Sequence, residues 1–260
     1  MQRQLGAIEK ASGGRLGVCI LDTGSGLRAG HREDERFPMC STFKFLAAAA
    51  VLARVDQGRE QLDRRIVFGR RDMIPHAPAT EKRIGEPGMT MAELCDAAVT
   101  LSDNPAANLM LASFGGPAGL TRFVRSLGDA KTRLDRNEPA LNESLPGDPR
   151  DTTTPAAMLG DMHKILLGDA LSPASRARIQ QWLDDNKTGD KRLRAGVPKD
   201  WVVGDKTGSG SRGSANDIAI LRPPRRAPIL VTAYLTGTEA SAEARDATLA
   251  SVSAVVAGHL

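Results

Sequence analysis

The sequence predicts an α+β fold in which a single antiparallel sheet is assembled from both ends of the chain. Strand-like segments occur early, at residues 15–31, and return late, at residues 201–236, whereas helical periodicity fills the interval and both termini. This order favours one sheet flanked by the terminal helices, with a helical part inserted between early and late strands. We expect one domain, with an α/β lobe at about residues 1–37 and 186–260 and a helical lobe at about residues 38–185.

The elements follow from local patterns. Residues 2–14 are predicted to form a short helix that ends at Gly13 and Gly14. The segment RLGVCILDTGSGLRAGH is predicted to be a hairpin with its turn at residues 22–26. Helical patterns follow at residues 43–55, 91–101, 105–114, 119–127, 155–167 and 173–183. Strand patterns at residues 201–208, 216–223 and 228–236 precede an amphipathic helix within residues 239–260.

Composition excludes several classes of protein. The 260 residues are 41% hydrophobic and 25% charged, which is typical of a globular protein. The longest apolar run, residues 45–53, is too short to span a bilayer. Aromatic residues make up only 3%, which argues against stacking platforms for nucleic acid. The net charge of +4 favours a small anionic substrate or an anionic surface only weakly.

The cysteines and histidines predict neither a disulfide framework nor a metal site. Cys19, Cys40 and Cys95 cannot all pair with one another, so we expect no disulfide framework. The four histidines lack the spacing of a zinc site, and we expect no metal. The first residues lack the apolar core of a signal peptide, which leaves either a cytoplasmic protein or an exported one whose signal has been removed.

One Ser and one Lys stand at the head of the apolar segment MCSTFKFLAAAAVLARV. The spacing of Ser41 and Lys44 places them on one face of a helix. A serine hydroxyl becomes a nucleophile when a neighbour takes its proton, and a lysine can do so when burial lowers its pKa. Taken alone, the motif also fits a solvated helix start with Ser41 as the N-cap.

Two further motifs follow in the chain. Ser-Asp-Asn at residues 102–104 precedes a helix predicted to begin at Pro105, and alone it is best interpreted as an N-cap cluster. Lys206 is predicted to end a strand, and Gly208 would let a ligand approach the backbone. The same Lys-Thr-Gly triplet at residues 187–189 follows a helix end, and we interpret that copy as a C-terminal helix turn.

The order S-x-x-K, S-D-N, K-T-G is far more specific than any one of these motifs. With it, the chain resembles a class A serine β-lactamase from about residue 16 to its end. The segments RLDRNEPALN and GDPRDTTTP match the two ends of that family's Ω-loop, here residues 133–151. Arg136 and Asp151 match the pair that ties the base of that loop, and the bond between Glu138 and Pro139 matches its cis peptide. The resemblance implies an αβα sandwich with an inserted all-α lobe, the β-lactamase/transpeptidase-like fold.

The resemblance also implies catalytic roles. Ser41 would attack the lactam carbonyl, and Ser102 with Lys44 would pass a proton to the departing nitrogen. Glu138 would activate a water held by Asn142 for deacylation. Whether Lys44 or Glu138 takes the first proton stays open at this stage. No metal or other cofactor is needed.

Substrate binding is implied for a second set of residues. Asn104 would hold the acyl-side amide, and backbone N–H groups of Ser41 and Ser209 would form the oxyanion hole. The substrate carboxylate would be held by Lys206, Thr207, Gly208 and Ser209. The partners would be penicillins, cephalosporins and β-lactamase inhibitors, with no nucleic acid and no membrane span. A periplasmic or secreted monomer that confers β-lactam resistance would be expected.

Three positions depart from the common pattern of the family. Ala215 stands where many members carry a carboxylate-binding Arg, and Arg192 matches the position from which another branch supplies it. The alternative is that Arg192 is an ordinary surface charge. Cys40 precedes the nucleophile as in the carbapenem-hydrolysing branch, but its disulfide partner there falls at Gly210. The gate position is His76, either a ligand-stacking group or a surface-loop histidine.

Two rival functions share the Ser–Lys chemistry. One is a DD-peptidase or transpeptidase, and the other is a β-lactam sensor that acylates without turnover. Both lack an Ω-loop Glu that deacylates efficiently, so Glu138 and Asn142 argue for the hydrolase.

Overall fold

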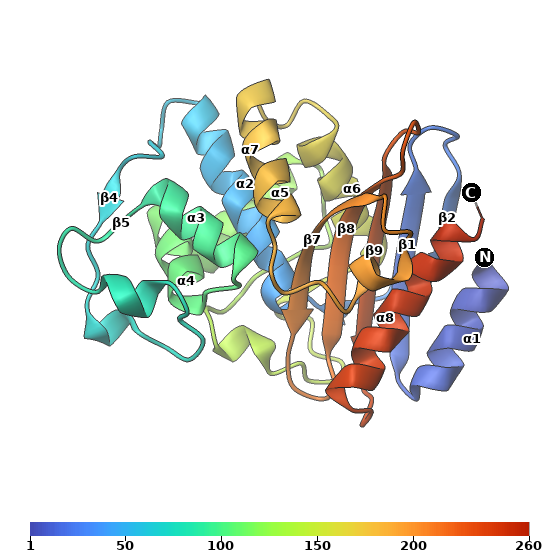
Figure 1. Cartoon of the computed structure of the whole chain (residues 1–260). Coiled ribbons are helices and arrows are strands. Elements are labelled where there is room, and N and C mark those ends of the chain that lie inside the picture. Colours follow the sequence, from blue (N-terminus) through green and yellow to red (C-terminus); the bar gives the residue numbers. More distant parts are fainter. Residues whose placement is uncertain (260) are drawn as a thin grey trace.

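A five-stranded antiparallel sheet divides the molecule in the computed structural model, which describes residues 1–259 (Figure 1). The strand order is β2-β1-β9-β8-β7. β1 pairs with β9 along its whole length, from Arg15 opposite Thr236 to Asp22 opposite Ile229, so the two chain ends meet inside the sheet. The strands are β1 (Arg15–Asp22), β2 (Arg28–His31), β7 (Val202–Ser209), β8 (Ala215–Arg222) and β9 (Ile229–Thr236). The predicted sheet is confirmed.

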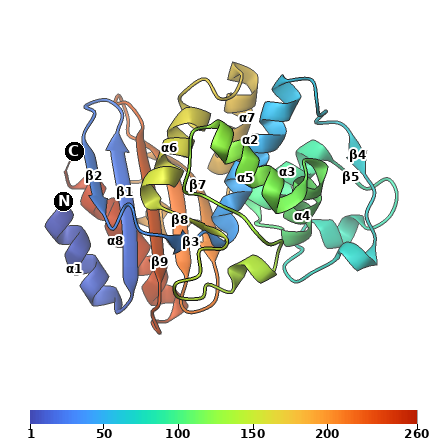
Figure 2. The same cartoon turned by 180° about the vertical axis from the view of Figure 1, so that it is seen from behind.

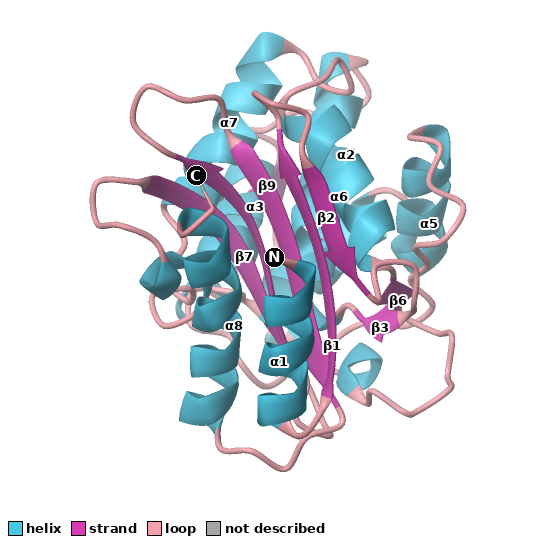
Figure 3. Cartoon of the chain, turned by 90° about the vertical axis from the view of Figure 1, so that its right-hand side faces the viewer, coloured by secondary structure: helices cyan, strands magenta, loops and turns pink. Residues whose placement is uncertain are grey.

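Helices cover both faces of this sheet, which confirms the α+β class. α1 (Gln2–Ser12) and α8 (Ala242–Ala257) lie side by side on one face (Figure 3). The inserted helices lie on the other side, as the view from behind also shows (Figure 2). They are α2 (Phe43–Asp56), α3 (Met91–Thr100), α4 (Asn104–Ser113), α5 (Gly116–Ser126), α6 (Pro155–Leu166) and α7 (Pro173–Asp184).

Each predicted helix is present, with small differences at the ends. α4 begins at Asn104 rather than Pro105, because Asp103 accepts a hydrogen bond from the amide of Ala106 and is the N-cap. α5 begins three residues earlier than its apolar pattern, at Gly116. The closing helix ends at Ala257; the last residue of the predicted segment, Leu260, lies outside the described residues.

The short elements were not predicted, because two or three residues carry no usable periodicity. β3 (Phe37–Pro38) pairs with β6 (Thr152–Thr153), and β4 (Arg65–Ile66) pairs with β5 (Met89–Thr90). The 3₁₀ turns are η1 (Cys40–Thr42), η2 (Arg70–Asp72), η3 (Thr80–Arg83), η4 (Ala140–Asn142) and η5 (Leu193–Gly196). The β3–β6 pair matters for function, because it brings the end of the Ω-loop beside the chain that enters η1.

Two apolar clusters hold the layers together. α2 lies in the larger one, and every residue from 43 to 53 is buried. A helix that is apolar on all sides belongs in the interior of a protein, because every face then removes hydrocarbon from water. The smaller cluster joins the sheet to α1 and α8 through residues such as Leu5, Val231 and Leu249. The head of α2 is thereby fixed against the sheet.

Cys19, Cys40 and Cys95 are buried and unpaired, as the sequence predicts. Within residues 1–259, no helix is both long and apolar enough to cross a bilayer.

Candidate active site

Ser41 lies in the η1 turn immediately before α2. The preceding residue, Cys40, has φ of 44°, a left-handed conformation that is strained for a residue with a side chain. Ser41 is not the N-cap of α2; that position is Thr42, and it makes no side-chain cap hydrogen bond. The hydroxyl of Ser41 donates instead to Glu138 Oε1 at 3.3 Å. The capping alternative for Ser41 is therefore wrong.

The strand β7 supports this turn at very close range. A Cβ on Gly208 would lie 2.8 Å from the carbonyl oxygen of Met39 and 3.2 Å from the amide nitrogen of Ser41. Asn216 on β8 donates its side-chain amide to the carbonyl oxygens of Pro38 and Met39, at 2.8 and 3.0 Å. Gly208 thus leaves room for the backbone of residues 39–41. Sequence reasoning missed Asn216, because no local pattern distinguishes it from the other residues of its strand.

Lys44 is fully buried one helical turn beyond Ser41. Its ammonium group lies 3.1 Å from Glu138 Oε1, and both side chains are 0% exposed. It also donates to the carbonyl oxygen of Ser102 at 2.7 Å and to Asn104 Oδ1 at 2.6 Å. Burial lowers the pKa of Lys44, while the Glu138 carboxylate acts in the opposite direction.

The Ω-loop presents Glu138 to both groups. The peptide bond between Glu138 and Pro139 is cis, as the resemblance implies. Asn142 donates its side-chain amide to Glu138 Oε2, so each carboxylate oxygen has a defined partner. At the base of the loop, Arg136 donates to Asp151 at 2.6 Å. The predicted pairing of Arg136 with Asp151 is confirmed.

Asn108 on α4 fixes the backbone of Glu138 and was missed by sequence reasoning. Its side-chain oxygen accepts from the amide of Glu138 at 3.0 Å, and its side-chain nitrogen donates to the carbonyl of the same residue at 2.9 Å. One available signal was its spacing, because Asn108 is four residues after Asn104 and therefore faces the same side of the helix.

Ser102 lies between two lysines. Its φ is 59°, and its hydroxyl oxygen is 3.4 Å from the ammonium group of Lys44 and 3.1 Å from that of Lys206. Burial and the positive charge of Lys44 lower the pKa of Lys206 to about 7. The prediction that Lys206 ends its strand is wrong, because β7 continues to Ser209.

Arg192 supports the end of β7. Its guanidinium group donates to the carbonyl oxygen of Gly208 and to the hydroxyl of Ser209, both at 2.8 Å. Asp246 on α8 accepts from the same group at 2.8 Å, and the Arg192 side chain is only 12% exposed. The surface-charge alternative is therefore wrong. Asp246 could not be found from the sequence, since 54 residues separate it from Arg192.

The second Lys-Thr-Gly triplet lies against the first. α7 ends at Asp184, so residues 187–189 are not a helix turn as interpreted from the sequence. The hydroxyl of Thr188 lies 2.5 Å from that of Thr207. Asn186 donates to Asp205 at 2.7 Å and accepts from the hydroxyl of Thr188 at 2.8 Å. Thr188 is thus held in place beside Thr207.

Asn104 and His76 lie together at the rim. Asn104 donates its side-chain amide to the carbonyl oxygen of Pro75 at 2.8 Å, and its backbone amide donates to the carbonyl oxygen of His76 at 2.9 Å. The exposed imidazole of His76 hydrogen-bonds the carbonyl oxygen of Leu101 at 3.0 Å. No group of three or more His, Cys, Asp and Glu side chains is placed to hold a metal ion among the described residues.

The chain is similar over nearly its whole length to proteins of one family. The family model described as "Beta-lactamase enzyme family" matches residues 1–260. Beta-lactamase CTX-M-97 of Escherichia coli is 48% identical over 256 residues, which cover 98% of this chain and 88% of that protein. Beta-lactamase L2 of Stenotrophomonas maltophilia is 51% identical over 247 residues, covering 95% and 81%. The solved structure of an ancestral class A β-lactamase has 63% identity and a TM-score of 0.98, covering 100% of this chain and 99% of that chain.

The contact between Cys40 and Gly210 leads to a prediction about the thiols. A Cβ on Gly210 would lie 2.7 Å from Cys40 Sγ, near enough for the two sulfur atoms to bond once the carbonyl of Asn142 and the hydroxyl of Ser144, each 2.9 Å from that Cβ, shift slightly. We expect Gly210→Cys to form a disulfide with Cys40 on air oxidation. Thiol labelling of denatured, unreduced protein should count three free thiols in the parent chain and two in the variant. The double variant Cys40→Ala/Gly210→Cys should count three, and four in Gly210→Cys would contradict the geometry.

Proposed function

The chain belongs to the class A serine β-lactamase family and hydrolyses β-lactams; from this premise we propose that it acts through a covalent acyl-enzyme on Ser41. We propose penicillins and cephalosporins as its substrates and resistance to them as its result. The observation that carries the mechanism is the position of Glu138. One of its carboxylate oxygens is within hydrogen-bonding distance of the Ser41 hydroxyl and of the Lys44 ammonium group.

Acylation begins when Ser41 Oγ attacks the lactam carbonyl carbon. The hydroxyl proton passes to Glu138, because that carboxylate accepts the hydrogen bond that Ser41 donates. No hydrogen bond joins Ser41 to Lys44 in the described residues; Lys44 donates to Ser102 and Asn104 instead. In the free enzyme this arrangement favours Glu138 over Lys44 as the first base. The developing oxyanion accepts from the backbone N–H groups of Ser41 and Ser209.

Collapse of the tetrahedral intermediate breaks the bond between the carbonyl carbon and the lactam nitrogen. The nitrogen leaves with the hydroxyl proton of Ser102, and Lys44 returns a proton to Ser102. Lys44 then takes the proton that Glu138 received from Ser41, across their 3.1 Å contact, so that Glu138 is a carboxylate again before deacylation. The contacts of Ser102 with both Lys44 and Lys206 support this route, because two ammonium groups favour the transient alkoxide.

Substrate binding uses the edge of β7. The substrate carboxylate lies beside Lys206, Thr207 and Ser209, and Gly208 keeps the strand against the nucleophile turn. Arg192 adds a second positive charge behind Ser209. At the rim, Asn104 donates to the acyl-side amide, and the exposed imidazole of His76 stacks on the acyl group.

Deacylation uses a water molecule between Glu138 and Asn142. Glu138 removes a proton from the water, and the resulting hydroxide attacks the ester carbon. The bond between that carbon and Ser41 Oγ breaks, and Glu138 returns the proton to Ser41. The contact between Asn142 and Glu138 supports this role and argues against a peptidase or a sensor. Export to the periplasm or outside the cell is the location we propose, and we propose a monomer.

Glu138→Gln should slow deacylation more than acylation. The variant loses the carboxylate that raises the pKa of Lys44, so neutral Lys44 can still take the proton of Ser41, whereas the water between Glu138 and Asn142 loses its proposed base. The change keeps the shape of the side chain and removes its basicity, and general-base assistance is worth about 10²–10⁴-fold. We expect a covalent penicillin adduct on Ser41 that persists long after the parent enzyme has returned to its free mass, measured by intact-mass spectrometry.

Two controls accompany this test. Glu143→Gln changes an exposed carboxylate of the same loop and should turn over normally, whereas Ser41→Ala should form no adduct. Turnover by Glu138→Gln at the parent rate would eliminate Glu138 as the base.

Arg192→Ala should weaken the recognition of the substrate carboxylate. A lost charge-assisted hydrogen bond is worth about 1.5–3 kcal/mol, or roughly tenfold to a hundredfold in kcat/KM. Steady-state kinetics with a penicillin measures the effect. Arg222→Ala is the matched control, because Arg222 is also paired with an aspartate, Asp184. Arg222 ends β8, whereas Arg192 contacts the backbone of Asn216 near the start of that strand. Equal kcat/KM in both variants would contradict the role of Arg192.

The lowered pKa of Lys206 predicts a pH dependence. Above its pKa of about 7, the free enzyme progressively loses this positive charge and binds the carboxylate less well. We expect kcat/KM to fall as pH rises from 7 to 9. Lys206→Arg stays protonated throughout this range, so its profile should lose that alkaline fall even if the variant is slower. The same alkaline fall in both proteins would assign it to another group.

A further inference from the structure

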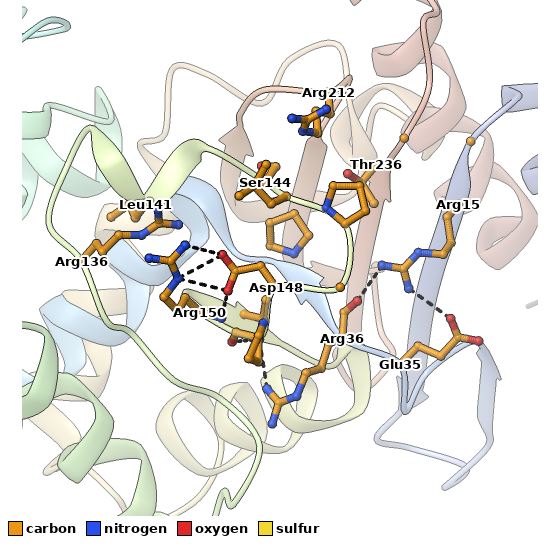
Figure 4. A pocket seen from close by; sticks show the side chains of 18 of the residues that line it. Arg15, Glu35, Arg36, Arg136, Leu141, Ser144, Asp148, Arg150, Arg212 and Thr236 are labelled. Carbon is orange, nitrogen blue, oxygen red and sulfur yellow. Dashed lines mark hydrogen bonds and ion pairs between the residues drawn. The ribbon is translucent and has the colours of Figure 1, made fainter.

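A cavity of about 590 Å³ lies behind the Ω-loop, apart from the catalytic groups (Figure 4). The Ω-loop forms one wall through residues such as Leu141 and Ser144, and the start of β1 and the end of β9 form the opposite side through Arg15 and Thr236. Ser41, Lys44, Ser102 and Glu138 do not line it. Its volume is in the range of about 300–1,000 Å³ that small-molecule sites occupy.

The lining of this cavity is strongly cationic. Its arginines are Arg15, Arg36, Arg136, Arg150 and Arg212, and its only carboxylates among the described residues are Glu35 and Asp148. Three of these arginines have carboxylate partners: Arg15 pairs with Glu35 at 3.0 Å, Arg150 with Asp148 at 2.7 Å and Arg136 with Asp151 at 2.6 Å. These three positive charges are compensated within the protein.

The remaining two arginines have no carboxylate partner within residues 1–259. Arg36 donates only to neutral oxygens, the carbonyl of Lys131 at 2.8 Å and the hydroxyl of Thr152 at 3.0 Å. Arg212 is exposed, and its side chain makes no hydrogen bond or ion pair with the part of the chain that the structure describes. Figure 4 shows the two on opposite sides of the cavity. A guanidinium group presents a fork of N–H donors that fits carboxylate, sulfonate and phosphate oxygens.

Between these charges the cavity is largely apolar. The hydrocarbon comes from Leu141, Leu145 and the prolines Pro38, Pro146 and Pro149. Proline has no backbone N–H, so this part of the wall presents little that must be hydrogen-bonded. An apolar wall flanked by uncompensated cations is complementary to a molecule with an apolar body and an acidic group.

We propose that this cavity binds a small organic anion, an aromatic or branched apolar molecule carrying one sulfonate, carboxylate or phosphate group. Arg212 binds the acidic group, the leucine and proline side chains contact the body, and Arg36 adds a positive charge on the opposite side of the cavity. The bound anion touches Leu141, which precedes the water-positioning Asn142, so the site lies directly behind the catalytic loop.

Naphthalene-1-sulfonate is the probe, and isothermal titration calorimetry on the whole chain is the measurement. We expect saturable binding of one molecule, with affinity that falls as salt is added. Arg212→Gln should weaken it by roughly tenfold to a hundredfold, the value of a charge-assisted hydrogen bond, and Arg36→Gln, which removes a more distant positive charge, should weaken it less. Naphthalene-1-methanol, which has the same ring and no charge, should bind at least tenfold more weakly. Equal affinity for the neutral compound, or no binding at millimolar concentration, would overturn the proposal.

Two control variants locate the binding. Arg225→Gln also replaces an exposed loop arginine with a left-handed backbone, φ 58° against 56° for Arg212, and should leave the affinity unchanged. Arg192→Ala removes a positive charge from the catalytic site and should also leave it unchanged. Loss of binding in Arg192→Ala, with normal binding in Arg212→Gln, would place the sulfonate in the catalytic site and refute the cavity. Circular dichroism verifies that each variant is folded.

Discussion

The buried ion pair between Lys44 and Glu138 is the constraint on which the rest of the site depends. Both side chains are completely removed from water, 3.1 Å apart. Either charge without its partner would bear a large uncompensated desolvation penalty. The chain must therefore fix the Ω-loop on the helical part closely enough to hold one carboxylate beside one ammonium group. The two arrangements that do this are the amide of Asn108 around the backbone of Glu138 and the pairing of Arg136 with Asp151.

A second constraint links the η1 turn, which contains Ser41, to the sheet. Gly208 and Asn216 hold residues 38–41 against β7 and β8 by close backbone packing and by two side-chain hydrogen bonds. Because α2 is buried on all sides, its first turn cannot move independently of the core. Ser41 is thus held between the sheet and the buried helix α2, and both limit the motion of its side chain.

Positive charge lies on both sides of the Ω-loop. On the catalytic side, Lys44 and Arg192 are paired with carboxylates, whereas Lys206 donates to the hydroxyl of Ser102. On the other side, Arg36 and Arg212 have no carboxylate partner among the described residues. The Ω-loop thereby separates two cationic sites, and among the described residues each contains cations that are paired with a carboxylate and cations that are not. Carboxylates within the loop itself, such as Asp148 and Asp151, neutralise the arginines that hold its shape.

The sequence by itself determined the long helices and strands and the order of the proposed catalytic groups. Periodicity located the long helices and the five strands, and three ordered motifs identified Ser41, Lys44, Ser102 and Lys206, because a few residues in fixed spacing are enough to specify their chemistry. The two-residue strands and the 3₁₀ turns were not predicted, since they contain no repeat. Only the tertiary structure decided the supports: Asn108, Asn216, Thr188 and Asp246 act through contacts between segments distant in the chain. A local pattern records which face of an element is buried, but hydrogen-bond partners that folding brings together from distant segments leave no local pattern.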